Sequence, residues 1–139
     1  MFKWFEQENI QWMKDIEDRN DIIYLVDTFY DQVRENKTIG PIFDEVAKIN
    51  WQEHLPNMYD FWESVLFGKG VFKGNPMIKH ILLSKKTTMS PVQFDAWLEL
   101  WTATVNANFM GKKSDEIISK AKSIANLMLY KIEQAKTFA

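Results

Sequence analysis

Apolar residues recur every three to four positions along most of the chain, which is the spacing of one face of an α-helix. The first such stretch begins near Asn20 and Asp21, either of which can cap a helix, and should end before Gly40. Pro41 then opens a short connecting helix. The sequence contains no strand-type alternation of apolar and polar residues and no internal repeat. The pattern therefore predicts an all-α protein.

A second long helix is predicted from the capping residue Asn50 to the stop signal at Gly68. Pro56 lies inside this stretch, so we expect a kink or a loosened first turn there. A glycine-punctuated loop follows, and Pro76 opens a short helix that runs through Leu83.

The clearest helix start is Ser90-Pro91-Val92-Gln93, which combines a capping serine, a proline at the first helical position and a glutamine at the reciprocal capping position. Gly111 can end this helix, and a final helix is predicted from Ser114 to about Lys136. Two long helices before the loop and two after it must pack in pairs to bury their apolar faces. The pattern of helices therefore predicts a two-over-two helical sandwich.

The length of 139 residues fits one domain, spanning 1–139, with residues 1–15 as an aromatic N-terminal extension or pre-helix. The 10 Phe, 6 Trp and 4 Tyr suit either a core built around a flat apolar ligand or a tightly packed helical bundle. The formal net charge is −2, and the 17 Lys and Arg form no stripe, which argues against nucleic acid as a partner.

The chain has no cysteine, which excludes disulfides, thiolate zinc sites and covalent attachment of a haem. No apolar run is long enough for a signal peptide or a membrane span, so we expect no membrane association and a cytoplasmic location.

The two histidines, His54 and His80, limit any imidazole chemistry. Neither stands in a zinc or di-iron motif, which leaves haem as the metal group to consider. His80 on its short helix can supply the one neutral imidazole that haem iron needs, or it is an ordinary histidine bonded to the backbone. Tyr30, His54 and Trp97 each offer a hydrogen-bond donor to a bound gas, although ordinary core packing or solvent exposure explains them equally.

Several short motifs occur in a fixed order along the chain. They are Phe29-Tyr30 with Val33-Arg34, Gly40-Pro41-Ile42-Phe43, Trp51-Gln52-Glu53-His54, Phe61-Trp62, Phe72-x-Gly74-x-Pro76-x-x-x-His80 and Phe94-x-x-Trp97-Leu98. In this order they resemble the group III truncated haemoglobins of bacteria, over roughly residues 16 to 132.

The resemblance implies a two-on-two helical sandwich around non-covalent haem b, with His80 as the proximal ligand to the iron. It places Tyr30, His54 and Trp97 at the distal positions and Lys79 near a haem propionate. The remaining contacts that it implies for the haem are apolar or aromatic: Phe43, Met58, Phe61, Trp62, Phe72 and Phe94.

Three functions stay open at this point. The first is reversible binding of O2, NO or CO at the iron, with a reductase that the sequence does not identify. The second is an enzymatic turnover of nitric oxide or a peroxide at the same site. The third is a haem-free helical module that binds a partner through its aromatic N-terminus. We expect a monomer, with a dimer as the alternative.

Overall fold

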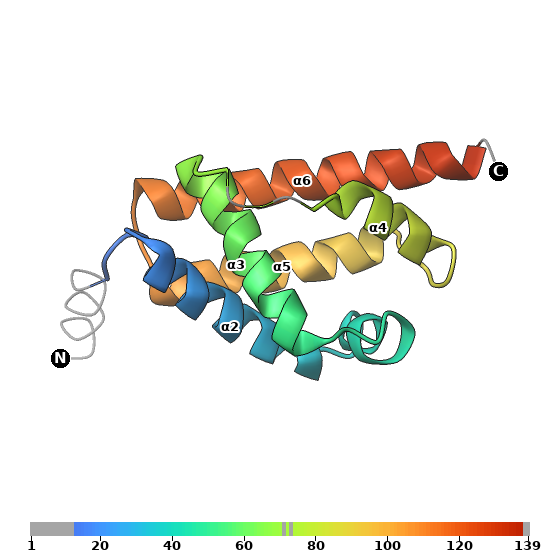
Figure 1. Cartoon of the computed structure of the whole chain (residues 1–139), viewed down its shortest axis with the longest axis horizontal. Helices are drawn as coiled ribbons and strands as arrows, with labels where there is room; N and C mark the ends of the chain where they lie inside the picture. The colour runs from blue at the N-terminus through green and yellow to red at the C-terminus, as the bar shows by residue number, and fades with distance from the viewer. Residues whose placement is uncertain (1–12, 71, 73, 138–139) are drawn as a thin grey trace, which may run out of the picture.

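The computed structural model describes residues 13–70, 72 and 74–137, and every regular element in that part of the chain is helical (Figure 1). The predicted all-α class is therefore confirmed. Most of the predicted N-terminal extension, residues 1–12, lies outside the described residues. In chain order the elements are α2 (Arg19–Glu35), the short π-helix η1 (Ile42–Val46), α3 (Trp51–Phe67), α4 (Pro76–Ser84), α5 (Pro91–Asn108) and α6 (Lys112–Thr137).

The helices pack as the predicted two pairs. Helix α2 packs on α3, α5 packs on α6, and the contact between α2 and α5 joins the pairs. The short helix α4 lies along α6, next to the long loop that leads out of α3 (Figure 1). None of the described helices is long and apolar enough to cross a membrane.

An aromatic stack fills the centre of the core between the pairs. Trp101 is fully buried, and the ring of Trp62 stacks on it at a centroid distance of 4.3 Å. Phe29 of α2 meets the same indole edge-on at 4.9 Å. Aromatic contacts in these two geometries add to the stabilisation that burial of the rings supplies. One residue of α5 therefore holds α2 and α3 against the second pair.

The helix ends follow the capping signals, with one correction. The side chain that caps α2 is Asp18, which accepts a hydrogen bond from the amide of Asp21 at 3.2 Å, so the prediction of Asn20 or Asp21 as the cap was wrong. Three capping candidates stand within four residues, and the one whose backbone is extended takes the role. Asn50 caps α3 as predicted, and Gly68 ends it in the left-handed conformation at a φ of 68°.

Helices α3 to α5 also follow the proline signals. Pro56 lies inside α3, which continues through it, although the proline cannot donate to the carbonyl four residues earlier. Pro76 opens α4, and Pro91 opens α5 behind the predicted capping box, in which Gln93 accepts a hydrogen bond from the amide of Ser90 at 2.9 Å.

Helix α6 begins at Lys112, two residues before the predicted Ser114, because a distant carboxylate caps it. Asp15 accepts hydrogen bonds from the amides of Lys113 and Ser114, both at 2.8 Å, and from the Ser114 hydroxyl at 2.7 Å. Burial alone would raise the pKa of Asp15, but these hydrogen bonds outweigh it and hold that pKa below 3.8. Gly111 is required beside this contact, since its φ is 143° and a Cβ there would lie 2.5 Å from Asp15.

Candidate functional site

His80 projects from the middle of α4, the short helix that Asn75 caps by accepting a hydrogen bond from the amide of Ile78. The Nδ1 atom of His80 lies 2.6 Å from the carbonyl oxygen of Pro76, one turn earlier. Because a carbonyl can only accept, Nδ1 carries the hydrogen and Nε2 keeps its lone pair. Burial lowers the pKa of His80 more than this hydrogen bond raises it. His80 therefore has the neutral form and the anchored ring that histidine ligands to metals show.

His54 lies near the start of α3, and its Nε2 atom is buried without a hydrogen-bond partner among the residues that the structure describes. Burial, with smaller contributions from the neighbouring His80 and Lys79, lowers the pKa of His54 to about 4. His54 is therefore neutral near pH 7 and lies close to the helix that carries His80. A buried nitrogen without a partner is costly, and such atoms gather where a ligand or a water belongs.

Three aromatic side chains surround the His54 imidazole. The ring of Tyr30 lies 5.2 Å from it between centroids, that of Trp51 5.6 Å and that of Phe43 6.2 Å. Burial raises the pKa of Tyr30 above 10, so its hydroxyl remains an O–H donor. Of the residues predicted for the site, the structure thus brings Tyr30, His54 and Phe43 together and adds Trp51.

Trp97 lies in the core stack instead of in this group. Its ring stacks on Trp62 at 6.4 Å and on Trp101 at 6.2 Å. Phe29 connects the two groups, since its ring lies 6.1 Å from Trp97 and 5.0 Å from Tyr30. The third predicted donor is therefore separated from Tyr30 by one aromatic ring.

The other predicted cofactor contacts lie on α3, α4 and α5 and in the loop between α3 and α4. Phe61 meets Trp62 at 5.1 Å and Phe72 at 5.2 Å, both edge-on. Met58 is half-buried against the core, Phe94 is buried within it, and Lys79 is exposed on α4.

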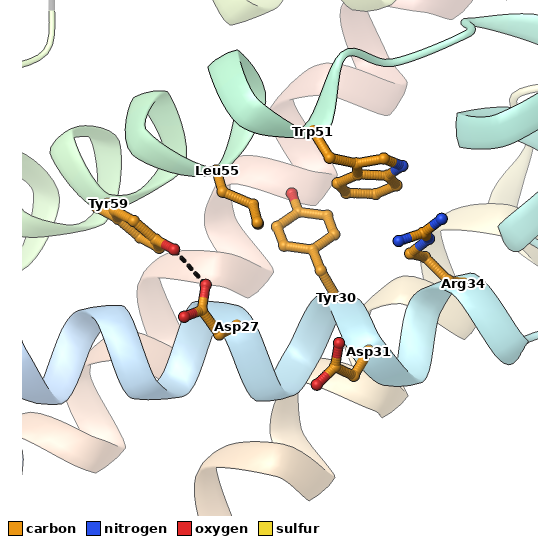
Figure 2. Close-up of a pocket in the computed structure, with 7 residues that line it drawn as sticks. All are labelled: Asp27, Tyr30, Asp31, Arg34, Trp51, Leu55 and Tyr59. Atoms are coloured by element: carbon orange, nitrogen blue, oxygen red, sulfur yellow. Dashed lines mark hydrogen bonds between the residues drawn. The ribbon is translucent and has the colours of Figure 1, made fainter.

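A pocket of about 300 Å³ opens between α2 and α3 (Figure 2), and His80 is not among its lining residues. Sequence reasoning did not predict it, although residues spaced by four on α3 mark the face that meets α2. Its lining residues are Asp27, Tyr30, Asp31, Arg34, Trp51, Leu55 and Tyr59.

The residues between α3 and α4 fit a haem. The Nε2 atom of His80 keeps its lone pair, and the buried Nε2 atom of His54 has no partner among the described residues. Aromatic rings surround the His54 imidazole. A two-over-two all-α fold with a neutral, anchored histidine on a short helix between the pairs defines a globin of the two-on-two class.

Comparisons with known proteins agree with this class. The group 3 truncated hemoglobin ctb of Campylobacter jejuni is 32% identical to this chain over 116 residues, which cover 79% of this chain and 89% of that protein. The crystal structure of the group III truncated hemoglobin from Campylobacter jejuni matches the fold with a TM-score of 0.73 and 28% identity, over 85% of this chain and 94% of that one. No protein-family model matches. The chain belongs to the group III truncated haemoglobins.

Proposed function

We propose that this protein holds haem b between α3 and α4, with His80 as the ligand to the iron, and reversibly binds a diatomic gas such as O2, NO or CO. The observation that carries the proposal is the His80 imidazole, whose Nδ1 atom donates to the carbonyl of Pro76 and so leaves the Nε2 lone pair available. Membership of the truncated haemoglobin family supports it. When bound, haem would supply an iron centre that can take up a diatomic gas.

The chain's own residues perform the rest of the binding. The Pro76 carbonyl fixes the orientation and the tautomer of His80, which raises the basicity of its Nε2 atom. The Tyr30 hydroxyl, His54 and Trp97 are the donors that we assign to the gas side, where a donor stabilises negative charge on a bound oxygen. Lys79, exposed on the same helix as His80, is the cation that we assign to a propionate.

Apolar side chains exclude water from the porphyrin in this proposal. Burial of a flat hydrophobic ring against aromatic and thioether groups provides most of the affinity for such a ligand. The residues that we assign to this contact are Phe43, Met58, Phe61, Trp62, Phe72 and Phe94.

The test is the ultraviolet–visible spectrum of haem-reconstituted protein, ferric and ferrous with CO, for wild type, His80→Gly and the control His54→Gly. We expect wild type and His54→Gly to show a sharp Soret band that responds to CO. His80→Gly should lose this band and regain it with added imidazole, because imidazole replaces the missing ligand. Identical spectra for wild type and His80→Gly would remove His80 from the iron, and a wild type that binds no haem would overturn the proposal.

A further inference from the structure

One stretch of the chain has a charge balance unlike the rest. Residues 64–94 contain no aspartate or glutamate, whereas the whole chain has a net charge of −2, so the other residues are acidic on balance. The stretch runs from the end of α3 through α4 into the first turn of α5, and it therefore includes the helix that carries His80. Its five lysines are Lys69, Lys73, Lys79, Lys85 and Lys86, of which Lys73 lies outside the described residues.

The lysines on and just after α4 are not neutralised by carboxylates. Lys79, Lys85 and Lys86 are exposed, and none of them forms an ion pair with the residues that the structure describes. Arg19 at the start of α2 differs, since its guanidinium lies 2.9 Å from Asp60 and 3.1 Å from Glu63. Unpaired cations project their field into solvent, so this side of the molecule attracts anionic groups.

Two exposed apolar side chains accompany these lysines. Ile78 is 54% exposed and Leu82 is 55% exposed, and they lie one turn apart on α4. Since a helix turns by about 100° per residue, the positions two before and two after His80 lie on the face of α4 opposite to it. Lys85 and Lys86 follow Leu82 by three and four residues. We call Ile78, Leu82, Lys85 and Lys86 the α4 surface.

A polar hollow of about 340 Å³ continues the α4 surface beyond the end of the helix. Hydroxyl and ammonium groups make up most of its lining, and both kinds of group can donate hydrogen bonds to a carboxylate. These lining residues are Ser84, Lys85, Lys86, Thr87, Thr88 and Lys136. The hollow therefore suits an acidic side chain of a partner.

The α4 surface lies close to the candidate iron ligand. His80 and this surface belong to the same helix, and a helix with its side chains is about 10–12 Å thick. A protein seated on the α4 surface is thus separated from the His80 imidazole by no more than one helix. Complexes that transfer electrons have small interfaces, so a few cations around two apolar side chains suffice for such contact.

We propose that the α4 surface docks an acidic one-electron carrier protein that keeps the iron in the ferrous state. This inference rests on the proposed function, since O2 and CO bind to ferrous haem. The reduced centre of the carrier gives up one electron and is oxidised, and the ferric iron accepts that electron and becomes ferrous. No bond forms or breaks in this step, and no proton has to move.

Charge and size favour a protein over a lipid surface as the occupant. The residues outside the stretch 64–94 are acidic on balance, and an anionic membrane would repel them. Helices that lie in a membrane interface bury a broad apolar face, whereas the nine-residue α4 exposes only Ile78 and Leu82 as large hydrophobic side chains. A carrier protein can place its acidic groups on the lysines alone.

The experiment uses the haem-reconstituted full chain and a plant-type [2Fe–2S] ferredoxin, a small acidic carrier, as the probe. Calorimetry of the ferric protein with oxidised ferredoxin measures docking without electron transfer. Stopped-flow spectroscopy under CO then measures the second-order rate at which reduced ferredoxin produces the ferrous CO complex. The variant is Lys85→Glu/Lys86→Glu. Its matched control is Lys120→Glu/Lys122→Glu, which changes the net charge equally at exposed positions on α6 outside the hollow.

We expect Lys85→Glu/Lys86→Glu to weaken docking and slow reduction on the order of tenfold at low salt, and the control to change both by less than about twofold. Added sodium chloride should slow the wild type and narrow this gap. The Soret spectrum and the CO affinity should stay at the wild-type values in both variants, because neither pair contacts the proposed haem site.

Equal docking and equal reduction rates for the variant and its control would overturn the α4 surface as the docking site. It is also overturned if the wild type fails to bind ferredoxin, including the case in which it binds vesicles of phosphatidylserine and phosphatidylcholine instead. The proposed function fails separately, because a protein that takes up no haem has no iron to reduce. That result removes both proposals, whereas equal rates in a red, CO-binding protein remove only the docking surface.

Discussion

The two ends of the helical sandwich treat their buried polar groups in opposite ways. At the α6 end, Asp15 accepts three hydrogen bonds from Lys113 and Ser114, and Gly111 leaves room for the carboxylate. At the α3 end, the Nε2 atom of His54 is buried without a partner, and the hydroxyl of Tyr30 forms no hydrogen bond within the described part of the chain. Since folding normally satisfies buried polar groups, the satisfied end serves stability and the unsatisfied end is available for a ligand.

The largest loss of stability should come from a substitution in the aromatic core between the two ends. Trp101→Ala removes a fully buried indole that stacks on Trp62, so we expect the free energy of unfolding to fall by about 3–5 kcal/mol. Urea denaturation of the haem-free protein measures the change. Leu127→Ala, at a position that is 51% exposed, is the control and should cost far less. A loss below about 1 kcal/mol for Trp101→Ala would show that the stack does not hold the pairs together.

The second-largest loss of stability should come from the α6 end, where Asp15 accepts its hydrogen bonds. Asp15→Ala removes the cap of α6 and should lower the free energy of unfolding by about 2 kcal/mol. The control is Asp115→Ala, an exposed carboxylate in the first turn of the same helix, and equal losses for the two variants would contradict the role of Asp15.

The free energies of unfolding of wild type and Asp15→Ala can also be compared as the pH is lowered. Because the pKa of Asp15 is lower in the folded protein than its ordinary value of 3.8, its ionised form stabilises the fold above pH 3.8. This contribution disappears as the pH falls through the folded pKa. The stability gap between wild type and Asp15→Ala should therefore be constant above that range and narrow below it.

The smallest effect on stability should come from the unsatisfied end. Tyr30→Phe removes a hydroxyl that forms no hydrogen bond with the described residues, so the free energy of unfolding should change by less than about 0.5 kcal/mol. If Tyr30 donates to the gas as proposed, dioxygen should leave this variant on the order of tenfold faster. Stopped-flow measurement of the dissociation rate tests this. A large loss of stability with an unchanged dissociation rate would show that the Tyr30 hydroxyl serves the stability of the fold and does not contact the gas.

Local signals in the sequence predicted the helices well, because apolar spacing and caps act within a few residues. Asn50, Gly68 and Pro91 each lie where the structure begins or ends a helix. The start of α6 was misplaced by two residues because its cap, Asp15, lies 99 positions before Ser114, and no local pattern reports such a contact.

The candidate site was predictable only in part. The histidines and Tyr30 were found because few residue types carry their chemistry, and the motif order grouped them. The position of Trp97 in the core stack depends on how α5 packs against α2 and α3, which spacing along the chain does not encode. The pocket beside Leu55 was missed for the same reason, since it exists only where the facing residues of α2 and α3 leave a gap.

The hydrogen bond between Asp15 and Ser114 also has a consequence for how the protein is made. A ribosome delivers the chain from its N-terminus, so Asp15 is synthesised before almost everything that it contacts. Its partner Ser114 is added 99 residues later, when α2 to α5 have already been synthesised. Until then, the nascent chain lacks the contact between Asp15 and the first turn of α6. The order of synthesis therefore makes the capping of α6 one of the last contacts to form.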